Sequence, residues 1–424
     1  MRTNGRRANA RVKAKANDNE DKFLGRQGKR TGEEAKEYAS REEAVMKANV
    51  GRQYDFGKPS APAETWEPFA RDARVGLRTE YAKGDDADVV QASLHVCVED
   101  DANESRTAVC LPREAYVKRM DKLVDEFIQR DMSYMSEEDK RDGDAFIRAV
   151  ERYLFEEQQY RAPTGWREAF SPYRTYFHNV IAQKVGIPAT LAAIYIGFLE
   201  RLKTKGALKC GDINVLLRVR RGADATPRRP WGIKAGDVVP EGAVACTPTM
   251  VIRQQLMALK RAFWPWEWDD SRDTGFLLAV ESAAYGKSDR MNTAAGVVGI
   301  IQPSGRPFGD LRMATLVTER LAELDGGVGY EQRDLGILLY HGGYRRDALV
   351  TLDKFQSWKA TARANAVEIS SASRARQPLD FAWVSGDPVI AAGLALREDE
   401  ALAKVLVELN RDALENQFAF APKN

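Results

Sequence analysis

The stretch that decides the fold runs from Ala149 to Lys203: AVERYLFEEQQYRAPTGWREAFSPYRTYFHNVIAQKVGIPATLAAIYIGFLERLK. Pro188 lies just after Gly186, and proline suits the first turn of a helix because the backbone N–H there has no partner. The residues that follow are apolar on almost every side of a helix, which predicts burial on several faces. They are Leu191, Ala192, Ile194, Tyr195, Ile196, Phe198, Leu199 and Leu202. We therefore expect a globular domain built around one central helix, which is too short to span a membrane.

Three motifs in this stretch resemble the SirB-type family of transglutaminase-like proteins. They are RYLFEE at 152–157, YFHNV at 176–180 and GIP at 186–188, the last leading into Leu191 and Ile194-Tyr195. A second match, EQRDLGILLY at 331–340, precedes Gly343-Tyr344 and Asp347-Ala348-Leu349, and is similar to the tetratricopeptide-like tail of that family. The two matches occur in the family's order.

The resemblance implies an α+β fold that is mainly helical. A transglutaminase-like, papain-type core would occupy residues 112–246, and a tetratricopeptide-like helical region would occupy 247–357. A C-terminal helical extension would cover 358–424. Ahead of the core, residues 51–111 are expected to form an extended arm and a small β region, and residues 1–50 a disordered N-terminus.

The composition narrows the classes of function. The chain has 424 residues, of which 44% are hydrophobic, and 64 Lys and Arg against 62 Asp and Glu. A net charge near zero gives no general attraction to nucleic acid or membrane. The four cysteines form no CxxC motif, and the chain has only three histidines, so we infer no metal site and no cofactor. Widely spaced cysteines favour a reducing compartment.

The N-terminal segment 1–17, MRTNGRRANARVKAKAN, holds six basic residues and no acidic one. This pattern is typical of an organelle transit peptide, and the chloroplast is the expected destination. A disordered tail and a nucleic-acid-binding arm are the alternatives. Residues 18–50 are charge-dense with few large apolar side chains, which predicts disorder.

Other segments predict the elements around the central helix. Residues 54–78 read as an extended arm, and the alternation in 87–98 predicts a strand that pairs with 105–111 across an acidic turn. Helices are expected after Pro112, over 144–158, after Thr247-Pro248, over 311–324 and over 388–410. Segments 210–220 and 231–239 are expected to form paired strands, and 330–340 with 344–355 a helical hairpin that stacks on the preceding helix.

The resemblance also implies the positions that catalytic residues would occupy in an active enzyme. A transglutaminase-like site needs a cysteine at the start of the core helix, where the helix dipole lowers the thiol pKa. It also needs a histidine on the following strand as the base. In this sequence those two positions hold Pro188 and Asn214. Neither residue can serve as nucleophile or base, which predicts a pseudoenzyme.

Two groups of residues are candidates for binding. Tyr176, His178 and Asn179 are expected to form a polar rim at the start of the core helix. Trp264, Trp266 and Trp268 mark a junction between helices, either as buried packing or as an exposed anchor for a partner. His178 is more simply a structural histidine, with a relocated thiol dyad to Cys210 or Cys246 as the alternative.

The combined prediction is a non-catalytic protein that binds other proteins inside an organelle. The alternative is a thiol-dependent hydrolase or transferase that acts on proteins or amides. Nucleic-acid binding through the N-terminal arm and the cluster between Arg218 and Arg229 is a weaker third hypothesis, because the chain lacks interleaved basic and aromatic residues.

Overall fold

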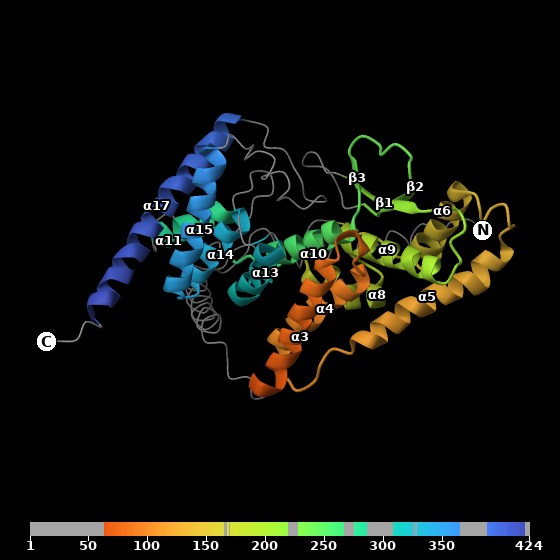
Figure 1. Ribbon diagram of the computed structural model, residues 1–424, viewed down its shortest axis with the longest axis horizontal. Coiled ribbons are helices and arrows are strands. Elements are labelled where there is room, and N and C mark those ends of the chain that lie inside the picture. The colour runs from red at the N-terminus through yellow and green to blue at the C-terminus, as the bar shows by residue number, and fades with distance from the viewer. Residues whose placement is uncertain are drawn as a thin grey trace, which may run out of the picture. The chain divides into compact units, whose positions relative to one another are not determined.

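The central helix is α9 (Pro188–Thr204), and other elements pack around most of its surface. The neighbours of α9 are α4 (Val89–Ser105), α5 (Arg113–Tyr134), α8 (Phe177–Gln183), α10 (Pro248–Phe263) and strand β1 (Ile213–Arg218) (Figure 1). Leu191, Ile194, Tyr195 and Phe198 are all buried, as the apolar pattern predicts. Pro188 is the first residue of the helix, where its missing N–H removes no hydrogen bond.

This computed structural model describes residues 63–164, 168, 170–218, 228–266, 275–285, 308–324, 326, 329–364 and 388–419, with side chains in the last two ranges given for 329–361 and 394–415. All of these lie in one compact unit, residues 53–424. The expected disorder of 1–50 and most of the glycine-rich segment 286–309 fall outside the described residues. None of the described helices has the length and apolar content needed to cross a bilayer.

A small antiparallel sheet has the strand order β2-β1-β3. It is formed by β1, β2 (Trp231–Lys234) and β3 (Ala243–Ala245). The pairing of β1 with β2 confirms the expected return strand, although β2 ends at Lys234, well before residue 239. Val215 and Leu217 lie on the face of β1 that joins the core shared with α9, and Leu216 lies on the opposite face.

The N-terminal part of the described chain is helical, so the predicted strand over 87–98 is wrong. Helix α3 (Ala63–Ala82) replaces the extended arm from Ala63 onward, and Pro68 lies inside it. Helix α4 continues through the expected acidic turn and reaches Ser105, so no strand pairs with 105–111. Asp88 begins α4, because its carboxylate accepts hydrogen bonds from the backbone N–H groups of Val90 and Gln91.

The sequence predicted a strand here because α4 is buried on several sides. Val89, Ala92, Leu94, Val96 and Cys97 lie on different sides of α4 and are all buried against α3 and the elements around α9. A helix enclosed in this way needs no polar face, so its sequence loses the period that would identify it. Packing outweighs the weak helix propensity of its β-branched residues.

The rest of the domain core follows the prediction closely. Helix α5 begins directly after Pro112, and α6 (Gly143–Glu151) continues into a π-helical segment, η2 (Arg152–Glu157). Short 3₁₀ turns, η1 (Gly84–Asp86) and η3 (Pro172–Arg174), precede α4 and α8. Thr247 begins α10 through a side-chain hydrogen bond from the N–H of Met250.

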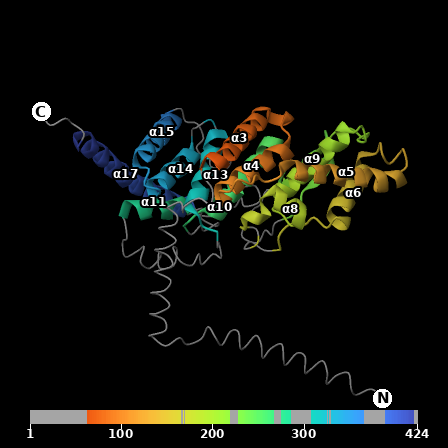
Figure 2. The same ribbon diagram turned by 90° about the horizontal axis from the view of Figure 1, so that it is seen from below.

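The described part of the chain from Pro248 onward is built of helices. It contains α10, α11 (Gly275–Tyr285), α13 (Leu311–Leu324), α14 (Tyr330–His341), α15 (Arg345–Ala364) and α17 (Pro388–Ala419) (Figures 1 and 2). Helices α14 and α15 form the expected hairpin, and α14 packs on α13 as predicted. Helix α17 packs on α11 and α15.

Candidate functional site

The start of α9 is where a transglutaminase-like enzyme would place its nucleophile, and here it is closed by apolar groups. Phe170, Ile187, Ala189 and Ala258 form a buried cluster around this helix end. Pro188 itself is buried, and no side chain caps the helix at Ile187. The first residue of the helix is therefore a buried proline, which supplies no thiol.

The turn that leads into α9 is held firmly by backbone contacts. The N–H of Gly186 donates to the carbonyl of Arg161 (3.1 Å), and the N–H of Ile187 donates to that of Arg174 (2.8 Å). A Cβ atom at Gly186 would lie 2.4 Å from Cγ1 of Val180, so only glycine fits here without movement. The GIP motif thus fixes the entry angle of the core helix.

The expected base position, Asn214, lies on β1 opposite Ile233 of β2. Side chains alternate along a strand, so Asn214 is on the face away from Ile213, Val215 and Leu217, which join the main core. No hydrogen bond among the described residues connects Asn214 with the start of α9. Pro188 and Asn214 lie on neighbouring elements, since β1 packs on α9, and their assignment as active-site positions stays a prediction.

Tyr176 and His178 do lie together, beside α5. Their rings stack with centroids 5.7 Å apart, and the ring of Tyr116 meets His178 edge-on at 5.6 Å. Burial lowers the pKa of His178 to about 4, and its Nδ1 atom has no hydrogen-bond partner among the described residues. At neutral pH the imidazole is therefore uncharged, and two aromatic rings flank it.

The polar rim expected from Tyr176, His178 and Asn179 is only partly present. Tyr176 is buried, and its hydroxyl donates to Oδ2 of Asp100 at 2.9 Å, so it belongs to the core and not to an exposed rim. Asn179 and His178 are half-buried. Tyr176 is buried because its hydroxyl supplies a hydrogen bond that the buried carboxylate of Asp100 needs.

A buried charged cluster that the sequence did not predict lies next to Tyr176. Arg320 of α13 donates to Asp100 of α4, and its Nη1 atom lies 3.8 Å from Glu99. Glu99 also accepts from Arg74 of α3 at 2.6 Å. Burial raises the pKa of Asp100, an effect that the charge of Arg320 opposes. These side chains connect three helices, and the only sequence signal for them was two acidic residues inside an apolar run.

Three of the four thiols have a raised pKa. Cys97 is buried in α4, and burial raises its pKa to about 12, although the backbone N–H of His178 opposes this. Burial also raises the pKa of Cys110 and of Cys210. The Cys210 thiol donates to the carbonyl of Gly211 at 3.8 Å, and no hydrogen bond among the described residues joins it to His178.

Cys246 follows β3, and its backbone N–H donates to the carbonyl of Val215 at 2.8 Å. The relocated dyad of His178 with Cys246 stays an alternative. Across the part of the chain that the structure describes, no three His, Cys, Asp or Glu side chains gather as a metal-binding set.

The tryptophans after α10 pack inward. Trp264 is fully buried, and its indole N–H donates to the carbonyl of Gly275 at 2.9 Å. Trp266 contacts Trp264 at 5.7 Å and the ring of His341 at 4.4 Å between centroids. Trp264 is therefore packing between α10 and α11 and cannot be an exposed anchor, whereas Trp268 lies outside the described residues.

The comparisons with known proteins agree with the position of this core. Residues 114–219 match the family model of the transglutaminase-like superfamily, a segment that runs from α5 to the end of β1. Neither the curated proteins nor the solved structures gave a match to the chain. Residues 114–219 are thus a transglutaminase-like superfamily domain.

Proposed function

We propose that the protein is a non-catalytic, SirB-type member of the transglutaminase-like group and that it binds other proteins. The observation that carries the first part is the apolar closure of the α9 start by Phe170, Ile187, Ala189 and Ala258. A thiol enzyme needs a nucleophile with a lowered pKa in reach of substrate. Pro188 supplies no nucleophile, and burial raises the pKa of Cys97, Cys110 and Cys210.

The binding surface that we favour is on α17. Leu396, Val407 and Leu414 are exposed on this helix, with 61%, 71% and 56% of their surfaces open to solvent. Together with Ala403 they are spaced by seven, four and seven residues, which places them on one line of the helix. We call these four residues the α17 stripe. An apolar line on an exposed helix suits the apolar face of a partner's amphipathic helix.

Helices α13, α14 and α15 support the proposal that the protein binds other proteins. They are consecutive and pack as neighbours, α13 on α14 and α14 on α15. The tetratricopeptide-like tail that the EQRDLGILLY motif implies would have this arrangement, so we propose that it presents α17 to the partner. As the place of action we propose an organelle such as the chloroplast, on the composition of residues 1–17 alone.

The test uses the full chain as bait and compares two matched variants. Val407→Glu adds a charge to the α17 stripe, and Val109→Glu adds the same charge at a valine that is 73% exposed in the loop before α5. We expect a partner captured by the wild-type protein to be lost with Val407→Glu and kept with Val109→Glu. The partner is then purified and its affinity for all three proteins is measured directly.

Two results would overturn this proposal. Equal affinity of the purified partner for the wild-type protein and Val407→Glu would remove the α17 stripe from binding. Turnover of a peptide amide or ester by the purified protein, lost on substitution of one cysteine, would instead establish the alternative thiol-dependent hydrolase or transferase.

A further inference from the structure

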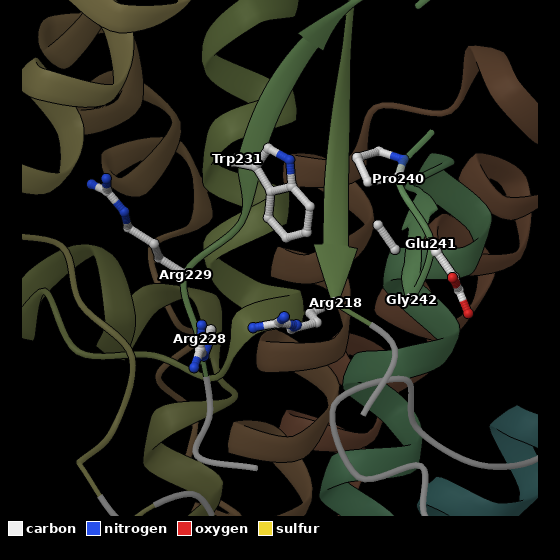
Figure 3. A pocket seen from close by; sticks show the side chains of 8 residues that line it. Arg218, Arg228, Arg229, Trp231, Pro240, Glu241 and Gly242 are labelled. Atoms are coloured by element: carbon white, nitrogen blue, oxygen red, sulfur yellow. The ribbon is translucent and has the colours of Figure 1, made fainter. Parts of the chain in front are cut away.

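A hollow with an arginine-rich lining lies against the sheet, on the side away from α9 (Figure 3). It has a volume of about 320 Å³ and is lined by Arg218, Arg228, Arg229, Trp231, Pro240, Glu241, Gly242 and Ala243. This volume is within the range of about 300–1,000 Å³ that small-molecule sites occupy. We call it the arginine hollow, and it is separate from the α9 start and from the α17 stripe.

The strand register creates the hollow. Leu216 pairs with Trp231 on β2 and with Ala245 on β3, so Trp231 lies on the face of Leu216. Arg218 is two residues further along β1 and therefore lies on that same face, where it pairs with Ala243. The indole of Trp231 therefore forms the floor of the hollow, and the side chain of Arg218 lies beside it (Figure 3).

The described lining of the hollow contains three arginines and one carboxylate, that of Glu241. Arg218 and Arg228 have no ion pair with a carboxylate among the described residues, whereas Arg201 pairs with Asp121 at 2.8 Å and Arg74 with Glu99 at 2.6 Å. The Arg218 side chain extends toward Arg228 below the indole of Trp231, and Glu241 is on the opposite wall (Figure 3). Two converging guanidinium groups attract an oxyanion, which each can hold with paired hydrogen bonds.

The third arginine has a different position. The guanidinium of Arg229 lies 4.8 Å from the ring centroid of Phe155, and its charge acts on Glu151, which also accepts a hydrogen bond from the N–H of Gly232 at 2.8 Å. These contacts hold the start of strand β2 against α6 and η2. Arg229 therefore anchors the wall of the hollow, whereas no carboxylate in the described part of the chain pairs with Arg218 or Arg228.

We propose that the arginine hollow binds a small ligand in which a phosphate or carboxylate group is joined to a flat ring. The oxyanion lies between Arg218 and Arg228, and the ring packs on the indole of Trp231. This site does not depend on the proposed protein binding, because it shares no residue with the α17 stripe.

The test is calorimetric titration of the full chain with phenyl phosphate, phenylacetate and inorganic phosphate. We expect phenyl phosphate or phenylacetate to bind more tightly than inorganic phosphate, and the tighter of the two identifies the oxyanion. Arg218→Ala and Arg228→Ala should each weaken binding about tenfold or more, since hydrogen bonds to charged groups are among the stronger ones. Both side chains are exposed, so the fold should tolerate these changes.

Two further variants distinguish the contribution of ring packing on Trp231 from a general effect of arginine charge. Trp231→Leu should weaken phenyl phosphate about three- to tenfold and leave inorganic phosphate unchanged. Arg411→Ala removes an arginine with a side chain that is 67% exposed on α17 and should change nothing.

Three outcomes would overturn the proposal. The first is the absence of measurable binding of any of the three probes at millimolar concentration. The second is equal binding of phenyl phosphate by the wild-type protein and by the double variant Arg218→Ala/Arg228→Ala. The third is a single-stranded oligonucleotide that binds at least a hundredfold more tightly than phenyl phosphate and competes with it, which would make the hollow part of a nucleic-acid surface.

Discussion

The guanidinium of Arg320 in α13 donates to the carboxylate of Asp100 in α4, and both side chains are buried. Asp100 also accepts the hydroxyl proton of Tyr176, so one carboxylate joins the C-terminal helices to the segment that precedes the core helix. Burial lowers the pKa of Arg320, but the charges of Asp100 and Glu99 outweigh it and the pKa is raised. Arg320 therefore keeps its positive charge, and this charge opposes the rise that burial causes in the pKa of Asp100.

Replacement of one partner should be costly and replacement of both should not. We expect Arg320→Met to destabilise the protein by about 3–5 kcal/mol, because the buried Asp100 would lose its cationic partner. Arg320→Met combined with Asp100→Leu should cost clearly less than the sum of the two single changes, as urea unfolding would show. Lys203→Met breaks the exposed pair with Asp212 and should cost under about 1 kcal/mol. Additive single effects would contradict the coupling.

The central helix should be sensitive to cavities. Leu191 is buried in α9, so Leu191→Ala should lower the free energy of unfolding by about 2–5 kcal/mol. Leu396→Ala, on the exposed side of α17, is the matched control and should have a small effect. Equal shifts of the denaturation midpoint for both variants would show that the assignment of α9 as the core helix is wrong.

The hairpin of α14 and α15 depends on one close approach. A Cβ atom at Gly336 would lie 2.5 Å from Cδ2 of Leu352, so Gly336→Ala should push the helices apart and destabilise the protein by about 1–3 kcal/mol. In Leu352→Ala the obstructing side chain is gone, and the same glycine change should then cost much less. Unfolding experiments on the four proteins give this comparison, and an unchanged cost would rule out the contact.

Glu200 on α9 should make stability depend on pH. Burial, helped by the nearby charge of Asp88, raises the pKa of Glu200 to about 7 from a usual 4.5. Between these two pH values the folded protein keeps a proton that the unfolded chain releases, so stability falls as pH rises through this window and the full cost is present above pH 7.

Glu200→Gln should therefore stabilise the protein above pH 7 by about 1–3 kcal/mol, a range that allows for solvent screening of this half-buried group. The gain should vanish near pH 4. Glu415→Gln, at a side chain that is 72% exposed, should show no such trend. Thermal unfolding at several pH values measures both, and a gain that grows toward low pH would contradict the assignment.

The cysteines should be unreactive. Because burial raises the pKa of Cys97 to about 12, this thiol should react with iodoacetamide far more slowly than a model thiol at neutral pH. We expect the other three cysteines to react no faster than a model thiol. Mass spectrometry of the labelled peptides follows each one. A single fast cysteine, slowed by His178→Ala, would restore the thiol-enzyme interpretation.

The sequence by itself determined the elements whose signals are local. Pro188 and Thr247 mark helix starts through backbone chemistry that needs no distant partner, and the apolar run after Pro188 predicted a buried helix that the structure confirms. The motifs around that helix also indicated a transglutaminase-like domain, which residues 114–219 match. The absence of a nucleophile at Pro188 followed from the alignment of those motifs and stays a prediction.

Only the tertiary structure decided α4, the charged cluster and the arginine hollow. Helix α4 was mistaken for a strand because it is buried on several sides, and burial removes the polar face that would reveal its period. Asp100 and Arg320 are 220 residues apart in sequence, and residues near 218, 230 and 242 meet only through strand register. Charge pairing and concave surfaces depend on which segments pack together, and that is set by the sum of many weak contacts.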